Sequence, residues 1–278
     1  MDMSDVFPEE CISETISFTC ARDACRFSVV STVFKSAADS DAVWEKFLPS
    51  DYREIISGSA SPLLLTTNVS KKDLYLHLCH NPIIINNGTM SFAIEKESGK
   101  KCYMVGVRGL SFSCGDSQCW KWSSLQESRF CKVAELNYVW WLDVKGKIDT
   151  KILSPKTNYG AYLVFKLTES TSGFRTRPVK LGVYLEGIDN GERRNVYLDP
   201  PRNTPKLSQK RGDGWMEIEM GEFFNENGDN GMLICSVFYF KGLHTKRGLI
   251  GLLGSFFFTG FKGFLIRLVL RYLKTITC

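Results

Sequence analysis

The feature that most constrains this chain is a period-two alternation of residue types that begins after residue 91. Between Tyr159 and Leu167, and again between Trp215 and Met220, alternate residues fall into two distinct sets. Successive side chains of a strand point to opposite faces, so this period predicts strands rather than helices. Further strands are expected at Val133–Ile152, split in two around Lys145-Gly146-Lys147, and at Val179–Leu185, Asn195–Leu198 and Met232–Phe240. Turn residues separate these runs, which predicts an antiparallel sandwich or barrel.

Residues 1–50 lack this alternation and predict three or four short helices. Pro8 suits the first position of a helix, and the two glutamates after it suit the positive end of the helix dipole. Ser40 or Asp41 can cap a later helix that Pro49 ends. So short a segment cannot bury all its apolar residues internally. The surplus indicates either docking on a partner or packing on the second domain, and the spacing leaves both open.

Residues 51–90 are expected to connect the two parts. The run Ser57–Pro62 predicts a flexible break, and Ser70 predicts the cap of a helix from Lys71 to His80. His77, Cys79 and His80 lie close together in the sequence, but this spacing on one helix does not converge on a metal ion. No metal site is therefore expected here.

Composition narrows the function classes. The apolar fraction of 44% fits a globular protein, and a net charge of +5 spread along the chain gives no reason to expect nucleic acid. The acidic first residues do not resemble a secretory signal, which predicts a cytoplasmic or nuclear location. Ten irregularly spaced cysteines without a Cys-x-x-Cys motif then predict reduced, mostly buried thiols.

Enzymatic patterns are not found in the sequence. It holds no Ser-His-Asp set, glycine-rich phosphate loop or zinc spacing. Glu217 and Glu219 share one face of a predicted strand, where a solvated surface is favoured over a glycosidase pair. We therefore predict no catalytic residue and no cofactor.

Three stretches of the first 50 residues resemble an F-box, and more narrowly the F-box of plant proteins that also carry a phloem-lectin domain. These stretches are Phe7–Ser13, Arg22–Arg26 and Ser36–Pro49. The resemblance implies docking on the Skp-family linker of a cullin-type ubiquitin ligase. Aromatic and aliphatic anchors would carry most of that binding energy. The contact candidates are Phe7, Pro8, Ile12, Ile16, Val29, Val30, Phe34, Trp44 and Phe47.

The remainder resembles the phloem-lectin, or Nictaba-like, domain. The matching stretches include Gly99–Met104, Trp120-Lys121-Trp122, Glu127–Phe130, Val133–Leu136, Tyr159–Leu167 and Asp213–Phe224. The resemblance implies recognition of glycans or glycoproteins that contain N-acetylglucosamine, with Trp120 and Trp122 as the carbohydrate-binding residues. Indoles suit this role because the apolar face of a sugar ring stacks on them.

Three positions depart from the family pattern. Cys114 stands where the family commonly has a tryptophan, and Met232 and Tyr239 stand where it has acidic residues. An aromatic anchor at the centre of a site contributes about 2 kcal/mol or more. We therefore predict sugar binding weaker than the resemblance implies.

Together these observations predict an α+β protein with a small all-α F-box followed by an antiparallel, jelly-roll-like β-sandwich. The expected domains are an F-box at 1–50, a connector at 51–90, the lectin-like sandwich at 91–250 and a divergent apolar and basic tail at 251–278. The tail is expected to be amphipathic or partly disordered, covering the sandwich or touching a membrane surface without spanning it. Two functions stay open: a ligase substrate adaptor, or a carbohydrate- or membrane-associated binding module without ligase function.

Overall fold

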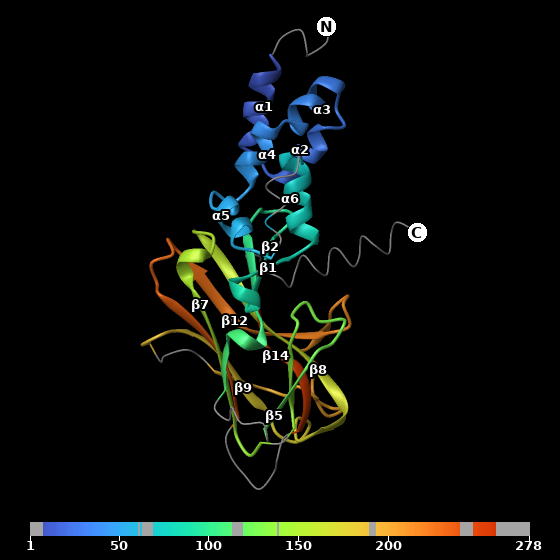
Figure 1. The fold of residues 1–278 in the computed structure, drawn as a ribbon, viewed down its shortest axis with the longest axis vertical. Coiled ribbons are helices and arrows are strands. Elements are labelled where there is room, and N and C mark those ends of the chain that lie inside the picture. Colours follow the sequence, from blue (N-terminus) through green and yellow to red (C-terminus); the bar gives the residue numbers. More distant parts are fainter. Residues whose placement is uncertain are drawn as a thin grey trace. The chain divides into compact units, whose positions relative to one another are not determined.

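The structure is a computed structural model, and it describes residues 8–60, 62, 69–112, 119–137, 139–188, 193–239 and 247–259, the last range as backbone only. The chain divides into two compact units (Figure 1). We call residues 1–87 and 91–102 the helical unit, and residues 88–90 and 103–278 the sandwich unit. Residues 91–102, which we assigned to the sandwich from sequence, thus group with the helices.

The helical unit consists of short helices and the first strands. Its elements are α1 (Glu9–Ser17), α2 (Ala21–Phe27), α3 (Thr32–Asp39), α4 (Asp41–Phe47), α5 (Tyr52–Ser57), α6 (Lys71–His80) and β1 (Ile83–Ile85). Pro8 occupies the N-cap position of α1 with Glu9 and Glu10 in the first turn, close to the predicted start. The prediction for α6 is confirmed in its bounds and in its cap, because the Asp73 backbone N–H donates to Ser70 Oγ at 3.1 Å.

Trp44 is at the centre of the helical core. Its side chain is fully buried, and its indole N–H donates to the Ala38 carbonyl at 2.7 Å. The rings of Phe47 and Tyr75 meet it edge-on, with centroids 5.5 and 5.3 Å away. Aromatic contacts of this geometry stabilise a core beyond the area that they bury. Trp44 therefore ties α4 to α6 within this unit.

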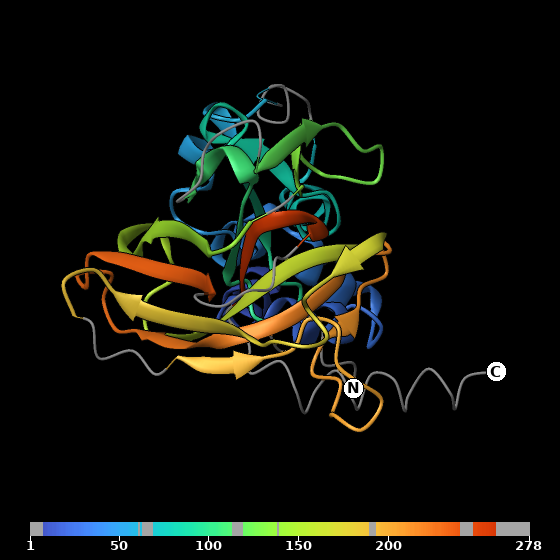
Figure 2. The same cartoon turned by 90° about the horizontal axis from the view of Figure 1, so that it is seen from below.

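The sandwich unit contains two antiparallel sheets, whose strands can be followed in Figure 2. Strands β2 (Met90–Ile94) and β3 (Lys101–Val105) are each shared between the two units. The first sheet has the order β1-β2-β3-β14-β8-β12-β11, and the second β10-β9-β13-β7-β4. The pair β5-β6 joins the first sheet through β6, which pairs with β14. The bounds are β4 Leu110–Phe112, β5 Trp120–Ser123, β6 Val133–Leu136, β7 Leu142–Asp149, β8 Thr157–Ser172, β9 Val179–Leu185, β10 Arg194–Val196, β11 Gln209–Lys210, β12 Met216–Asn225, β13 Met232–Tyr239 and β14 Arg247–Thr259.

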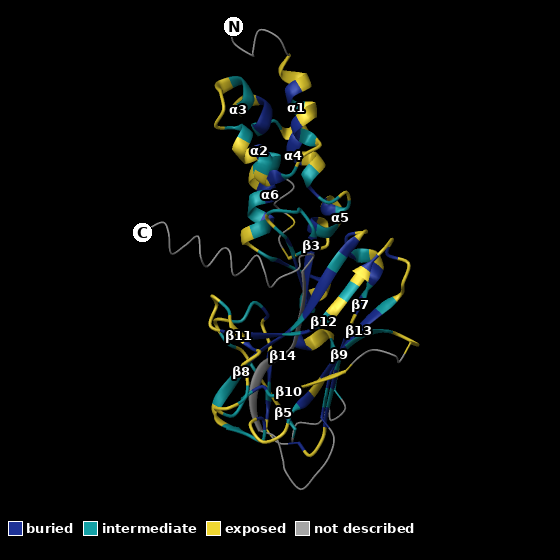
Figure 3. Ribbon diagram, turned by 180° about the vertical axis from the view of Figure 1, so that it is seen from behind, coloured by how far each residue is buried: buried dark blue, intermediate teal, exposed yellow. Residues whose placement is uncertain are grey.

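The two sheets pack face to face over an apolar core, shown by the buried residues in Figure 3. Leu163 and Phe165 of β8 are fully buried, as are Leu233 and Val237 of β13. A side chain at Gly221 of β12 would come within 3.3 Å of Val183 on β9 in the opposite sheet. The predicted antiparallel sandwich is confirmed.

Two expectations about strands are wrong. Lys145-Gly146-Lys147 is not a turn, because β7 runs straight through it and Gly146 pairs with Cys235 and with Leu110 on either side. A glycine in a strand can mark a close approach of neighbours as readily as a turn. Residues 251–259 do not begin a tail, since they continue β14, which pairs with β8 and β3. The rest of the predicted tail, from residue 260, lies outside the described residues.

The cysteines differ from the expectation of reduced, mostly buried thiols. Cys11, Cys25 and Cys131 are exposed free thiols, whereas only Cys102 and Cys235 of the described free cysteines are buried. Cys119 is disulfide-bonded. Among the described residues, no helix is long and apolar enough to cross a membrane.

Candidate functional site

A tight turn between α2 and α3 exposes two adjacent valines. The Val29 and Val30 backbone N–H groups donate to the Arg26 and Phe27 carbonyls, and this fixes the turn just after α2. Val29 is 85% exposed and Val30 is 63% exposed. The Phe27 and Phe34 rings flank the turn, with centroids 6.2 Å apart. We call residues 27–34 the valine turn, and it presents aliphatic side chains that find no cover within the described part of the helical unit.

The predicted linker contacts fall into three groups. Val29, Val30 and Pro8 are exposed, and Phe34 and Phe47 are half-buried. Ile12, Ile16 and Trp44 are buried in the helical core, so their side chains hold the helices together rather than face a partner. Phe7 lies outside the described residues. Periodicity marked these positions as apolar, but could not say which apolar positions the neighbouring helices cover.

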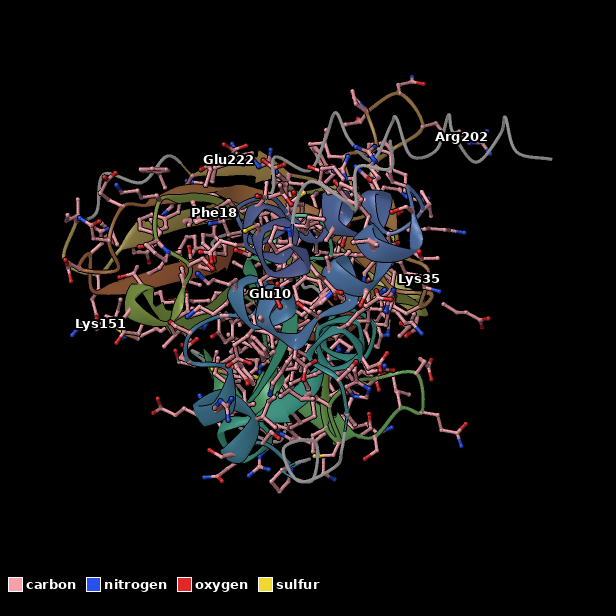
Figure 4. All side chains as sticks on the ribbon, turned by 90° about the horizontal axis from the view of Figure 1, so that it is seen from above. Glu10, Phe18, Lys35, Lys151, Arg202 and Glu222 are labelled. Carbon is pink, nitrogen blue, oxygen red and sulfur yellow. The ribbon has the colours of Figure 1, made fainter. Side chains whose placement is uncertain are left out.

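Sequence reasoning missed one exposed aromatic residue of this unit. Phe18, labelled in Figure 4, follows α1 and is 77% exposed. The Lys46 ammonium lies 5.7 Å from its ring centroid. An aromatic residue directly after an amphipathic helix was the available signal, because it breaks the pattern of the buried positions Ile12 and Ile16.

In the sandwich unit an aromatic cluster joins the edges of the two sheets. Phe112 on β4 meets Trp120 and Trp122 on β5 edge-on, at centroid distances of 4.8 and 5.8 Å. Trp120 is buried, and its indole Nε1 has no hydrogen-bond partner among the described residues. Trp122 is 44% exposed. A buried donor without an acceptor is costly, and the open indole face of Trp122 is the part of this cluster that a ligand can reach.

The two predicted tryptophans are thus brought together, and the sequence missed Phe112, which touches both. The three positions that depart from the family pattern do not lie together in this way. Cys114 lies outside the described residues. Met232 and Tyr239 are the two ends of β13 and lie on opposite faces of it, with Tyr239 buried inside the sandwich. Side chains seven residues apart on one strand cannot line one face together.

Other exposed indoles precede β7. Trp140 is 53% exposed and Trp141 is 43% exposed, between β6 and β7. They follow Asn137, whose backbone N–H donates to the Cys119 carbonyl next to Trp120. Both lie in a bend before β7 and not in the strand itself, and the strand pattern therefore did not single them out.

The two carboxylates on β12, Glu217 and Glu219, do not form the solvated face that the sequence predicts. Glu217 is buried, and the Arg211 guanidinium lies 3.2 Å from it, while the same group contacts Asp213 at 3.1 Å. Glu219 is half-buried, next to an irregularity in the pairing of β12 with β8. A buried carboxylate needs such a cation. Glu217 therefore has a structural partner, which the alternation alone did not reveal.

This arrangement defines the class of protein: a small unit of short helices followed by a β-sandwich that carries surface indoles. Comparison with known families makes the assignment specific. The F-box domain matches residues 5–46, and phloem protein 2 matches residues 100–252. The chain belongs to the family of F-box proteins with a phloem protein 2 domain.

Relatives from Arabidopsis thaliana support this membership over most of the chain. F-box protein At2g02240 is 44% identical over 255 residues, which are 88% of this chain and 77% of the relative. F-box protein PP2-B10 is 43% identical over 253 residues, or 88% of this chain and 90% of the relative. A solved structure of TmCBM61 with β-1,4-galactotriose covers 54% of this chain and 81% of its own, at 12% identity and a TM-score of 0.25. So loose an overlap adds nothing to the assignment.

Proposed function

We propose that this chain is a substrate-recognition adaptor of a cullin-type ubiquitin ligase, acting in the cytoplasm or nucleus. The helical unit docks on a Skp-family linker, and the sandwich unit holds the protein to be ubiquitinated. The observation that carries the proposal is the valine turn, which exposes Val29 and Val30 within the residues that match an F-box. Exposed aliphatic side chains on a small folded unit mark an interaction surface.

The valine turn also fits the physics of a docking surface. Its backbone is fixed by hydrogen bonds, so little conformational entropy is lost when a partner covers it. Half-buried Phe34 extends the apolar surface beside the two valines. Trp44 is buried in the helical core, where its indole N–H donates to the Ala38 carbonyl, and is not part of this surface.

Isothermal titration of the full chain with a Skp-family linker tests the docking. The double substitution Val29→Asp/Val30→Asp places two charges in the contact and should weaken binding by about 100-fold or more. Phe224→Asp is the matched control, because Phe224 is an exposed apolar residue of the sandwich unit. Equal affinity of the double variant and the control would refute docking through this turn.

The chain itself catalyses nothing in this account. It raises the effective concentration of the substrate beside the transferring subunits. The fully reconstituted ligase should ubiquitinate the substrate, and removal of the adaptor should abolish that transfer. Discharge of ubiquitin by the isolated chain, without the other subunits, would contradict this role.

The phloem protein 2 domain binds the substrate, and the affinity of this domain for sugars is weak. Trp122 offers an open indole face, but the Trp120 Nε1 is buried, and Tyr239 is an inward-facing core residue instead of a carboxylate acceptor. Titration with N-acetylglucosamine oligomers should give binding weaker than micromolar, and Trp122→Ala should remove what remains. Micromolar binding that Trp122→Ala abolishes would show that the family's full sugar affinity survives.

A further inference from the structure

The sequence contains four Asn-Gly dipeptides, and the structure places three of them in different surroundings. Asn87-Gly88 precedes β2, Asn227-Gly228 and Asn230-Gly231 lie in the connection between β12 and β13, and Asn190-Gly191 lies outside the described residues. This dipeptide is chemically reactive, because the backbone nitrogen of the glycine can attack the side-chain carbonyl carbon of the asparagine. Glycine has no side chain to block that approach. Which dipeptide reacts therefore depends on how free its glycine nitrogen is.

The fold restrains the glycine nitrogen of Asn227-Gly228. Gly228 is buried, and its N–H donates to Asn225 Oδ1 at 3.1 Å. A side chain at Gly228 would come within 3.1 Å of the Lys151 backbone, so the chain is closely packed there. Attack on the Asn227 amide requires this nitrogen to lose its proton and to move, and both steps break the hydrogen bond. Asn227 is therefore protected, although the residue itself is exposed.

Asn87-Gly88 is restrained by its local geometry. Gly88 is half-buried and is the last residue of the short 3₁₀ turn Asn86–Gly88. Hydrogen bonds between residues three apart close a turn of this type. The glycine of this dipeptide is therefore less free to move than a glycine in open chain.

Asn230-Gly231 lacks both kinds of restraint. Asn230 and Gly231 are exposed, and a side chain at Gly231 would meet no atom within 4 Å. The Gly231 carbonyl accepts from the Thr150 backbone N–H at 3.0 Å, but the Gly231 N–H has no hydrogen-bond acceptor among the described residues. Its nitrogen can therefore approach the Asn230 amide without breaking a hydrogen bond of its own.

We propose that Asn230 is a site of spontaneous deamidation in the folded chain. The Gly231 nitrogen bonds to the side-chain carbonyl carbon of Asn230, and the bond from that carbon to the amide nitrogen breaks. Ammonia leaves with the proton of the glycine N–H. Water then opens the five-membered imide to aspartate or isoaspartate, so water is the only co-reactant. The site goes beyond the proposed function, because neither the valine turn nor the aromatic cluster takes part.

Deamidation at this position changes the start of β13, which lies between β9 and β7 in the second sheet. The product carries a new negative charge beside exposed Asp229. The isoaspartate form also lengthens the backbone by a methylene directly before the strand. We expect this to disturb the hydrogen bond from Thr150 to Gly231. The modified sandwich unit should therefore unfold at a lower temperature.

Incubation of the full chain in mildly alkaline buffer, followed by proteolysis and mass spectrometry, measures the reaction at each asparagine. Asn230 should deamidate about tenfold faster or more than Asn227, because only the second reaction must break a buried hydrogen bond. In denaturant the two dipeptides should react at similar rates, since Gly228 is then released. Equal rates in the folded chain, or a difference that persists in denaturant, would overturn the proposal.

Two variants sharpen the assignment. Asn225→Ala removes the acceptor of the Gly228 N–H and should bring the rate at Asn227 close to that at Asn230, with circular dichroism confirming that the chain is folded. Asn230→Gln is the control for the consequence, because glutamine cannot form the five-membered imide. After incubation the wild type should show a lower thermal midpoint and Asn230→Gln an unchanged one. An equal decrease in both chains would refute the effect on β13.

Discussion

The two units of this chain expose apolar side chains for different structural reasons. In the helical unit, Val29 and Val30 stand out because a local turn after the seven-residue helix α2 leaves them without a neighbour. In the sandwich unit, Trp122 is half open because β5 lies at the edge of its sheet, where β6 is its one partner among the strands that the structure describes. The first surface is made by adjacent residues of one turn, and the second by strands that belong to two different sheets. The helical surface should therefore tolerate changes in the sandwich, and the reverse.

The substitution with the largest expected effect removes the centre of the helical core. Trp44→Ala should destabilise the helical unit by about 3–5 kcal/mol, because it leaves a cavity between α4 and α6. Urea unfolding followed by circular dichroism at the helix band measures this loss. Trp122→Ala is the control, since an exposed indole should change the free energy of unfolding by less than about 0.5 kcal/mol. Equal unfolding midpoints for the two variants would remove the distinction between buried and exposed indoles.

A smaller effect is expected at the buried amide of the sandwich. Asn225 donates to the Leu153 and Ser154 carbonyls at 3.4 and 3.0 Å, and its Oδ1 accepts from the Gly228 backbone N–H at 3.1 Å. Asn225→Ala leaves these buried groups unpaired and should cost about 2–3 kcal/mol. The loss should appear in the thermal unfolding of the strands and leave linker affinity unchanged. Exposed Asn203→Ala is the matched control, and reduced linker affinity in Asn225→Ala would show that the units are coupled.

The smallest expected effect concerns the rates at which the cysteine thiols are chemically modified. Burial raises the pKa of Cys79 to about 12, so its thiolate is about a thousandfold scarcer at neutral pH than that of an ordinary thiol. Burial also raises the pKa of Cys235. Iodoacetamide at pH 7.5 should modify exposed Cys11, Cys25 and Cys131 first, as read by mass spectrometry of peptides. The rate at Cys79 should increase about tenfold for each added pH unit. Rapid labelling of Cys79 at pH 7.5 would mean that α6 opens readily.

The sequence predicted those parts of the fold whose signals are local. The helix Lys71–His80 and its Ser70 cap are confirmed, as is the strand Val179–Leu185, because capping and alternation act within a few residues. The false turn at Gly146 and the extension of β14 to Thr259 depend instead on pairing with strands far along the chain. No local sequence pattern predicts which distant strands these residues pair with.

In the candidate sites, too, the sequence predicted local features and missed contacts between distant segments. Val29, Val30 and the Trp120–Trp122 pair were named from sequence, whereas Phe112 came from a different sheet and was missed. Trp44 was named as a contact because apolar periodicity does not distinguish a core face from a docking face. The hydrogen bond from the Trp215 indole to the Glu127 carbonyl joins residues 88 positions apart, which the sequence could not show.

Hydrogen exchange of the full chain, with and without a saturating Skp-family linker, tests the central claim most directly. Amides of residues 26–35, around the valine turn, should become protected when the linker binds, because its surface covers Val29 and Val30. The strands β7, β9 and β13 should exchange at the same rate in both states. Protection confined to these strands, with unchanged exchange at residues 26–35, would contradict docking through the helical unit.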